Sequence, residues 1–227
     1  MEKFLIVSHV VSGSSVLLLG FIQMLNRKGG KSHIVLGKIY VGAMWWICFS
    51  ALAIITWYRF SAFLMVIAVL TFHSSFVGVR MLKRKKTKDV RWYDWMTNII
   101  TMCFGVGLVG YAVFVYINHP GSMVFIFLCS LFGTFTFFNS YKDLKFLTKK
   151  EEKSKRWRIK QHVSAMGGSY IAAVTAFTIQ NPDIFIPYPT HQWLLWVLPS
   201  AIGSPIIARV LTRMDKQSVS FVKTAEK

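Results

Sequence analysis

Charged residues are scarce in this sequence, and acidic ones most of all. Only nine of its 227 residues are Asp or Glu, and charged residues make up 16% of the chain against 54% hydrophobic residues. So little charge cannot cover a water-facing surface of ordinary composition. We therefore expect an all-α integral membrane protein in contact with a lipid bilayer, and not a soluble domain.

The nine acidic residues also avoid the long apolar segments. They fall in tails, in turns or at helix mouths, so we expect no carboxylate deep in the membrane. This placement argues against a carboxylate-bridged di-iron centre and against a transporter with a buried Asp or Glu proton relay. The sequence also lacks a G-x-S-x-G elbow and an H-E-x-x-H zinc helix. Histidine is then the only side chain in the apolar region that we expect to bind a metal or transfer a proton.

Cysteine is equally sparse. Cys48, Cys103 and Cys129 stand alone inside apolar segments and form no C-x-x-C pair. We expect neither a disulfide framework nor a cysteine metal site.

The net charge of +18 comes from basic residues in short blocks between apolar segments. A nucleic-acid surface would instead place them along one exposed face. We interpret the blocks as cytoplasmic anchors and expect no nucleic-acid partner.

Seven apolar segments have about the ~20 residues needed to cross a ~30 Å hydrocarbon core. The turns after the first, third, fifth and seventh are basic, whereas the others hold only Arg59. The positive-inside rule then places the N-terminus outside and the C-terminus in the cytoplasm. No loop is long enough for a soluble domain, so we expect one bundle over residues 1–227. The spans cover approximately residues 4–25, 34–57, 60–82, 96–117, 122–141, 161–180 and 193–211.

Small residues indicate where helices approach closely. In the sixth span Ser164, Gly168, Ala172 and Ala176 recur at every fourth position, which predicts a central helix. In the fourth span the segment G-V-G-L-V-G, residues 105–110, matches a dinucleotide-binding pattern, but no strand precedes it and no acidic residue follows about 20 residues later. Close helix packing explains these glycines better.

The histidines divide by depth. His9 falls toward the outer face, His33 and His162 lie at the inner face, and His73 is buried between them. Two neutral imidazoles that hold one haem iron must share a depth. At 1.5 Å per residue, His73 lies roughly 14 Å from the inner end of its helix, so only His33 and His162 match each other.

This inner pair predicts a metal, haem or quinone site, with Tyr40 and Ser169 as hydrogen-bonding support. The alternative is that both histidines cap helix starts or bond to neighbouring loops. Arg80 and Arg84 lie one turn apart on one helix side, where they could hold an anionic headgroup, a haem propionate or a phosphate. Plain positive-inside anchoring is the other explanation for this pair.

Several of these landmarks together resemble an uncharacterised bacterial multipass membrane family, catalogued as domain of unknown function 2306. The similar features are His9 with Gly13, the H-x-x-x-G-x-x-Y pattern of His33, Gly37 and Tyr40, the His162 helix with its TAF at 175–177, and W-x-x-P-x-x-x-G at Trp196, Pro199 and Gly203. The resemblance implies a multipass fold in the bacterial inner membrane and no particular activity.

Three functions fit the sequence. The first is a redox-associated bundle that binds haem b or a quinone through its inward histidines, His33, His162, His73 and His9. The second is a permease for a small uncharged or anionic solute, gated where glycine and proline loosen the helices. The third is a non-catalytic partner that assists assembly of a larger complex or forms a homo-oligomer. The sequence decides neither whether the protein is an enzyme nor whether it holds a cofactor such as haem b or a quinone.

Overall fold

The computed structural model describes residues 1–58, 60–119, 121–148 and 154–225, and all regular secondary structure in them is helical. Arg59, on which part of the expected charge asymmetry rests, lies outside these ranges. The elements are α1 (Glu2–Leu25), α2 (Lys31–Trp57), α3 (Ala62–Lys83), η1 (Thr87–Asp89), α4 (Trp92–Asn118), α5 (Met123–Thr148), α6 (Lys155–Gln180), α7 (Pro182–Phe185), η2 (Pro189–Trp196) and α8 (Leu198–Ala225).

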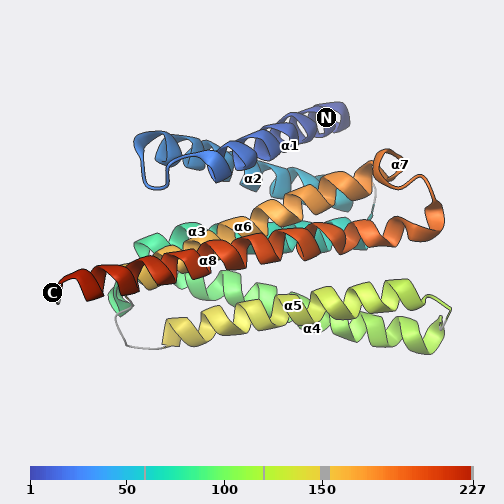
Figure 1. The fold of residues 1–227 in the computed structure, drawn as a ribbon. Helices are drawn as coiled ribbons and strands as arrows, with labels where there is room; N and C mark the ends of the chain where they lie inside the picture. The colour runs from blue at the N-terminus through green and yellow to red at the C-terminus, as the bar shows by residue number, and fades with distance from the viewer. Residues whose placement is uncertain (59, 120, 149–153, 226–227) are drawn as a thin grey trace.

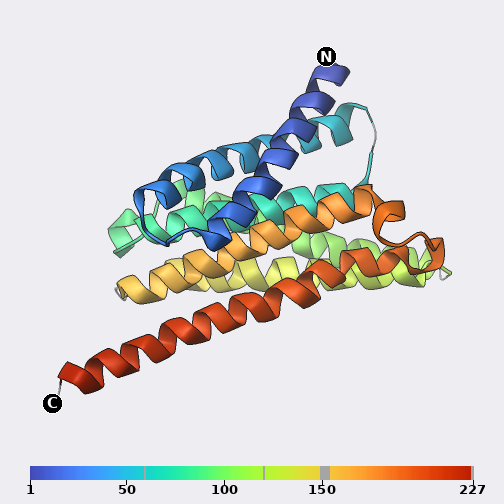
Figure 2. The same ribbon diagram turned by 45° about the horizontal axis from the view of Figure 1, so that its top comes forward.

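The long helices run roughly along one direction in three groups (Figure 1). The hairpins α1–α2 and α4–α5 lie on opposite sides of α3 and α6, and α8 packs against α6 from the outside (Figure 2). Helix α6 packs against α3, α8 and α1, whereas α4 and α5 pack mainly on each other. The central position expected for the sixth span is thus confirmed. The last part of α8 extends beyond the other helices (Figure 2).

Six helical segments in the described residues are long and apolar enough to cross a membrane. Helix α6 is not among them, so the structure supports six of the seven expected spans by length and composition. The reason is its content of small and polar residues, which suits a helix surrounded by other helices. Large apolar side chains such as Phe114 and Phe135, each 57% exposed, cover the outside of the α4–α5 hairpin. This architecture fits a multipass membrane protein.

The end of α5 and the start of α6 differ from the expectation because charge was treated as a helix end. Helix α5 continues past residue 141 to Thr148, and α6 already begins at Lys155. In the added turns of α5, Lys142 and Lys145 are exposed whereas Asp143 and Leu147 are buried. The turn is amphipathic and not a solvated linker. The prediction that every acidic residue lies in a tail, in a turn or at a helix mouth was therefore wrong for Asp143.

Glycines allow close contacts between helices at several places. A Cβ on Gly105 would lie 2.8 Å from the Gly133 carbonyl oxygen of α5, so α4 and α5 meet backbone to backbone there. Gly107 and Gly110 face open space. The packing explanation of the G-V-G-L-V-G segment is confirmed for Gly105 alone. Gly78 of α3 similarly accommodates Met166 of α6.

The polar turns gather at two ends of the bundle. The α1–α2 turn, the α3–α4 turn, the start of α6 and the C-terminus share one end (Figure 1). We call it the basic end because residues 27–31 and 83–91 carry most of their charge as Lys and Arg. In the first of these turns Gly29 has φ +79, a conformation that favours glycine. The opposite end holds the N-terminus, the α4–α5 turn, α7 and η2.

Candidate functional site

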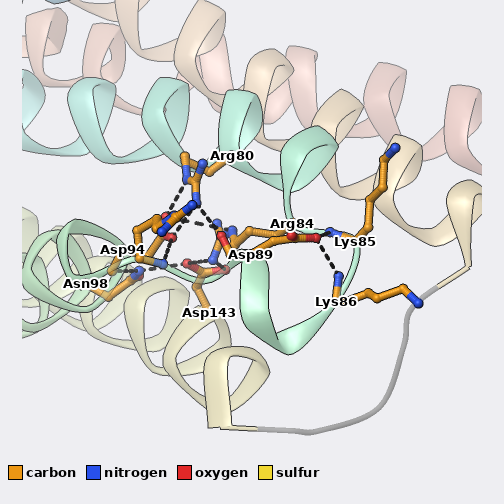
Figure 3. Close-up of polar contacts among 9 residues, drawn as sticks. Arg80, Arg84, Lys85, Lys86, Asp89, Asp94, Asn98 and Asp143 are labelled. Atoms are coloured by element: carbon orange, nitrogen blue, oxygen red, sulfur yellow. Dashed lines mark hydrogen bonds and ion pairs between the residues drawn. The ribbon is translucent and has the colours of Figure 1, made fainter.

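A cluster of buried polar side chains joins α3, α4 and α5 near the basic end (Figure 3). We call it the polar cluster. Its members are His73, Arg80 and Arg84 of α3, Asp94 and Asn98 of α4, and Asp143 of α5, and all six are at most 9% exposed. Ionisable groups buried in a membrane bundle are expensive unless they pair, and they commonly mark functional sites.

The first ion pair joins α3 to the start of α4. The guanidinium of Arg80 donates from Nε to Asp94 Oδ1 at 2.7 Å and from Nη2 to Asp94 Oδ2 at 2.6 Å. Such a two-point pair fixes orientation as well as distance. Asp94 Oδ2 also accepts from the backbone N–H of Arg91 at 2.9 Å, which caps α4. One carboxylate therefore begins α4 and ties it to α3.

Arg84 links both helices of the α4–α5 hairpin to α3. Its Nη1 donates to Asp143 Oδ2 at 3.2 Å, and its Nε lies 3.9 Å from Asp94 Oδ1. The side chain is only 1% exposed, yet Nε and Nη2 have no hydrogen-bond partner. Two arginines thus face two carboxylates, and the pairs balance in charge. Arg84 is nevertheless under-bonded, so its environment is poorer than that of Arg80.

Asn98 extends the cluster from the ion pairs to His73. Its Nδ2 donates to the backbone oxygen of Asp94 at 2.8 Å and to Asp143 Oδ2 at 2.7 Å. Because both partners can only accept, the amide oxygen must face His73 Nε2, which lies 2.8 Å away. The Nε2 atom of His73 therefore carries a proton. This chain of bonds connects His73, well inside α3, with the charges at the basic end.

The helical repeat of α3 explains why these groups share a face. Steps of three, four and seven residues return to the same side of a helix. Such steps separate the successive residues of this face of α3, which are Val66, Leu70, His73, Arg80 and Arg84. The first two are apolar and the last three are polar. One face of α3 therefore changes from apolar to charged along its length.

The loop after α3 is held by Asp89 of η1. Its Oδ2 accepts from the backbone N–H of Lys86 at 2.9 Å and of Lys85 at 3.0 Å. These two bonds, with the nearby lysine charges, hold the pKa of Asp89 below its usual range. The Asp89 carbonyl also accepts from Arg80 Nη2 at 2.9 Å, so the loop and the polar cluster are connected.

An open-sided cavity of about 570 Å³ lies at the opposite end of the bundle, beside the starts of α3 and α5. We call it the distal cavity. It is lined by the start of α3, the α4–α5 turn, the first turns of α5, the end of α6 and η2. None of the described residues that line it is charged. The aromatic side chains among them are Phe125, Trp193 and Trp196.

An apolar cluster separates the distal cavity from the polar cluster. It consists of Val66, Leu70, Leu108, Ala112 and Cys129, with Phe125 packed against it. Along α3 the order is cavity, apolar cluster, polar cluster, and α4 and α5 have the same order read from their common turn. The junction therefore has a cavity at one end, apolar side chains in the middle and ion pairs at the other end.

The four candidate histidines are placed in three separate environments. His73 belongs to the polar cluster. His9 of α1 bonds through Nδ1 to Ser50 Oγ of α2 at 2.9 Å, near the opposite end. His33 and His162 lie at the basic end, close enough for their charges to interact. The shared depth expected for this last pair is thus compatible with the structure, whereas the other two stand apart.

The supporting residues predicted for the inner pair bond to each other. Tyr40 Oη and Ser169 Oγ lie 3.0 Å apart, and both side chains are buried between α2 and α6. Ser169 Oγ also donates to the Met166 carbonyl at 2.8 Å, so Tyr40 is the donor between the two hydroxyls. Both groups are therefore used in joining helices.

Sequence reasoning missed Asp94 and Asp143, the partners of Arg80 and Arg84, and Asn98, which connects Asp143 to His73. Two signals were available. Asp94 and Asn98 are spaced four apart at the start of an apolar segment, and Arg80 and Arg84 have the same spacing at the end of the preceding one. Two buried arginines on one face require acceptors, and the neighbouring helix supplies them. Arg80 is held by the Asp94 carboxylate and the Asp89 carbonyl, and Arg84 by the Asp143 carboxylate, so the predicted anion or headgroup role is not needed to explain their position.

No protein-family model, no curated protein and no solved structure matches this chain. Within the described ranges, no three His, Cys, Asp or Glu side chains gather where they could hold a metal ion. The geometry of the junction between α3 and the α4–α5 hairpin is therefore the feature that bears most directly on function.

Proposed function

We propose that this protein is a multipass inner-membrane carrier for a small solute. Its solute enters the distal cavity and passes along the junction between α3 and the α4–α5 hairpin. The observation that carries the proposal is the order of features along that junction: a cavity, then the apolar cluster, then the polar cluster. A carrier exposes its site to one side of the membrane at a time, and this order is what a conformation open at one end requires.

The hairpin is built to move relative to α3. Helices α4 and α5 pack far more extensively on each other than on α3. At the basic end the hairpin is joined to α3 by the pairs of Arg80 with Asp94 and Arg84 with Asp143. Rocking of one packed unit against another is a common route of alternating access. Separation of the ion pairs would open the basic end, while closure of the cavity would shut the other.

The energy of the polar cluster sets the cost of that motion. Leaving one charge of a buried pair without its partner typically costs about 3–5 kcal/mol. Entry of water between the helices offsets this cost, because both charges are then hydrated. The under-bonded Nε and Nη2 of Arg84 lower the cost further, since fewer bonds must be broken.

The membrane topology of the carrier follows from charge. We assign seven spans, with α6 as the interior one, an external N-terminus and a cytoplasmic basic end. A bacterial inner membrane and the resemblance to domain of unknown function 2306 belong to the same proposal. The distal cavity then opens to the outer side.

Uptake into proteoliposomes tests the proposal without knowledge of the solute. Vesicles with the wild-type protein are incubated with a deproteinised cell extract, and their contents are identified by mass spectrometry. Val124 lines the distal cavity, so V124W should fill it. Leu131 lies on the same helix, is 41% exposed and does not line the cavity, so L131W is the matched control. We expect one or more compounds to accumulate with wild type and L131W, and far less with V124W.

No compound enriched over protein-free vesicles would refute the carrier function. Equal uptake by V124W and wild type would also contradict the route through the distal cavity. Thermal unfolding of each variant in detergent shows that a loss of uptake does not reflect a loss of fold.

A redox role through His33 and His162 is the second candidate, and a specific observation favours it. The Gly78 carbonyl can only accept, so His162 Nδ1 donates to it at 2.8 Å and Nε2 keeps its lone pair. His33 Nδ1 is buried without a hydrogen-bond partner. Both imidazoles thus have a ring nitrogen that could bind a haem iron or another metal, or accept a hydrogen bond from a quinol hydroxyl, and such a group would supply electron transfer. The two described cavities, of about 570 and 340 Å³, are not lined by either residue.

Visible absorption spectra of the air-oxidised and dithionite-reduced protein test this second candidate, with metal analysis of the same sample. A Soret band that shifts on reduction and is lost in H33A and H162A would support it. A flat spectrum and no stoichiometric metal, from cells with ample haem, would exclude haem and metal at this pair.

A further inference from the structure

The lining of the distal cavity has one chemical character. It combines the rings of Phe125, Trp193 and Trp196 with hydroxyl and amide groups, and no charged side chain lies among its described residues. A charged solute would lose part of its hydration there without gaining an ion partner among these residues. Aromatic rings instead offer apolar faces. The cavity therefore selects for neutral solutes.

Two polar groups at the cavity have defined hydrogen-bonding roles. Gln192 Nε2 donates to Asp183 Oδ1 at 3.1 Å and to the Ile186 carbonyl at 3.3 Å. Both its hydrogens are therefore used, which leaves Oε1 as an acceptor. Ser61 Oγ accepts from the Leu64 N–H at 3.4 Å, so its own hydrogen remains to be donated. A solute that satisfies both groups must itself offer a donor and an acceptor.

The size of the cavity limits the solute further. Its volume of about 570 Å³ falls in the range of about 300–1,000 Å³ that is usual for small-molecule sites. A macromolecular segment or a single ion would fit this combination of volume and lining poorly.

We propose that the distal cavity binds an uncharged small solute with one aromatic or apolar face and with hydroxyl or amide groups along its edge. This assignment rests on the carrier function proposed above and names the class of its solute. The rings cover the apolar face of the solute, Ser61 donates to its edge and Gln192 accepts from it. Nucleosides and aryl glycosides have this chemistry, and their phosphorylated forms do not.

Binding to the full-length protein in lipid nanodiscs tests the assignment. Calorimetric titration uses two neutral probes, adenosine and phenyl β-glucoside, and two charged counterparts, adenosine monophosphate and phenyl phosphate. The proteins are wild type, V124W with a filled cavity and L131W as control. We expect saturable binding of at least one neutral probe to wild type and L131W. Binding to V124W should be at least about tenfold weaker, and the charged counterparts should not bind.

Three results would overturn the assignment. They are the absence of saturable binding for both neutral probes, equal binding of a neutral probe and its charged counterpart, and equal binding to V124W and wild type. A lipid that co-purifies with wild type and L131W but not with V124W would assign the cavity to an acyl chain and also overturn it.

The binding and uptake experiments can fail separately. One outcome is that neutral probes bind to wild type and not to V124W, while proteoliposomes take up no compound. This outcome would support the binding site and refute the carrier. Uptake that V124W leaves intact, with no probe binding, would refute the site and leave a carrier with another route.

Discussion

Arg84 is the residue on which the polar cluster depends most. Its guanidinium is 1% exposed and faces carboxylates from both α4 and α5. We expect R84M to destabilise the protein by about 3–5 kcal/mol, because it leaves Asp143 buried without its charge partner. The double variant R84M/D143L removes both charges and should recover a large part of the loss. Unfolding in detergent by denaturant, analysed as a double-mutant cycle, measures this coupling.

Lys145 provides the control for that cycle, because it lies on α5 near Asp143 but is exposed. K145M should change stability by less than about 0.5 kcal/mol. Additive effects of R84M and D143L would contradict the pairing.

The bond network of Asp89 predicts a pH dependence in the α3–α4 loop. The amides of Lys86 and Lys85 hold the pKa of Asp89 below its usual range, so the folded loop favours the carboxylate. The stabilisation is then complete above the ordinary carboxyl pKa and is lost as pH falls through the lowered value. Hydrogen exchange of these two amides should show protection at pH 5 that disappears on further acidification.

The variant D89N keeps an acceptor at this position but cannot titrate. Its amide protection should therefore be weaker and should not change over the same pH range. Protection of the wild-type amides that persists at pH values well below the carboxyl range would show that Asp89 does not hold the loop.

At the level of helices, the contact between α4 and α5 depends on Gly105. A methyl group there would meet the Gly133 oxygen and the Phe137 nitrogen at 2.8 Å, and backbone atoms cannot move aside as a side chain can. We expect G105A to destabilise the protein by about 1–3 kcal/mol through overpacking. Gly107 faces open space on the same helix, so G107A should be neutral or slightly stabilising. Thermal unfolding measures the stability of the two variants. Equal effects of G105A and G107A would contradict the close contact between α4 and α5 at Gly105.

Helix positions were largely predictable, because long apolar segments between short polar turns leave few alternatives. Helix ends were not, since a lysine or an aspartate inside an amphipathic turn has the same composition as a loop. Residues 142–148 show this, where the helix continues because Asp143 and Leu147 face inward. The predicted seventh span begins at residue 193, inside η2 (Pro189–Trp196), whereas the regular helix α8 starts at Leu198. The two elements together contain one apolar segment, Pro189–Asp215, long enough to cross a membrane.

The candidate site was only half predictable for a related reason. A single sequence shows that Arg80 and Arg84 share a helix face, but which carboxylates meet them depends on how α3 packs against α4 and α5. The distal cavity has no signature in the sequence, because it is formed by residues from α3, α5, α6 and η2 that are distant in the chain.

For the molecule as a whole, the charge distribution predicts an orientation. Single cysteines at Lys28 and Lys85 of the basic end, and at Ser122 and His191 of the other, can be introduced after the three native cysteines are replaced. In intact cells a membrane-impermeant maleimide should label only the latter two positions, because the positive-inside rule places the basic end in the cytoplasm. Labelling of position 28 or 85 would reverse the assigned topology.

The central claim is that the α4–α5 hairpin moves against α3 so that one end opens as the other closes. Spin labels at Phe60 and Ser122 report on the distal end, and labels at Lys83 and Lys145 report on the basic end. Distance distributions from pulsed electron paramagnetic resonance in nanodiscs measure both pairs. We expect R84Q to lengthen the distance at the basic end and to shorten it at the distal end, in protein that remains folded. A single unchanged distance for both pairs in wild type and R84Q would contradict alternating access at this junction.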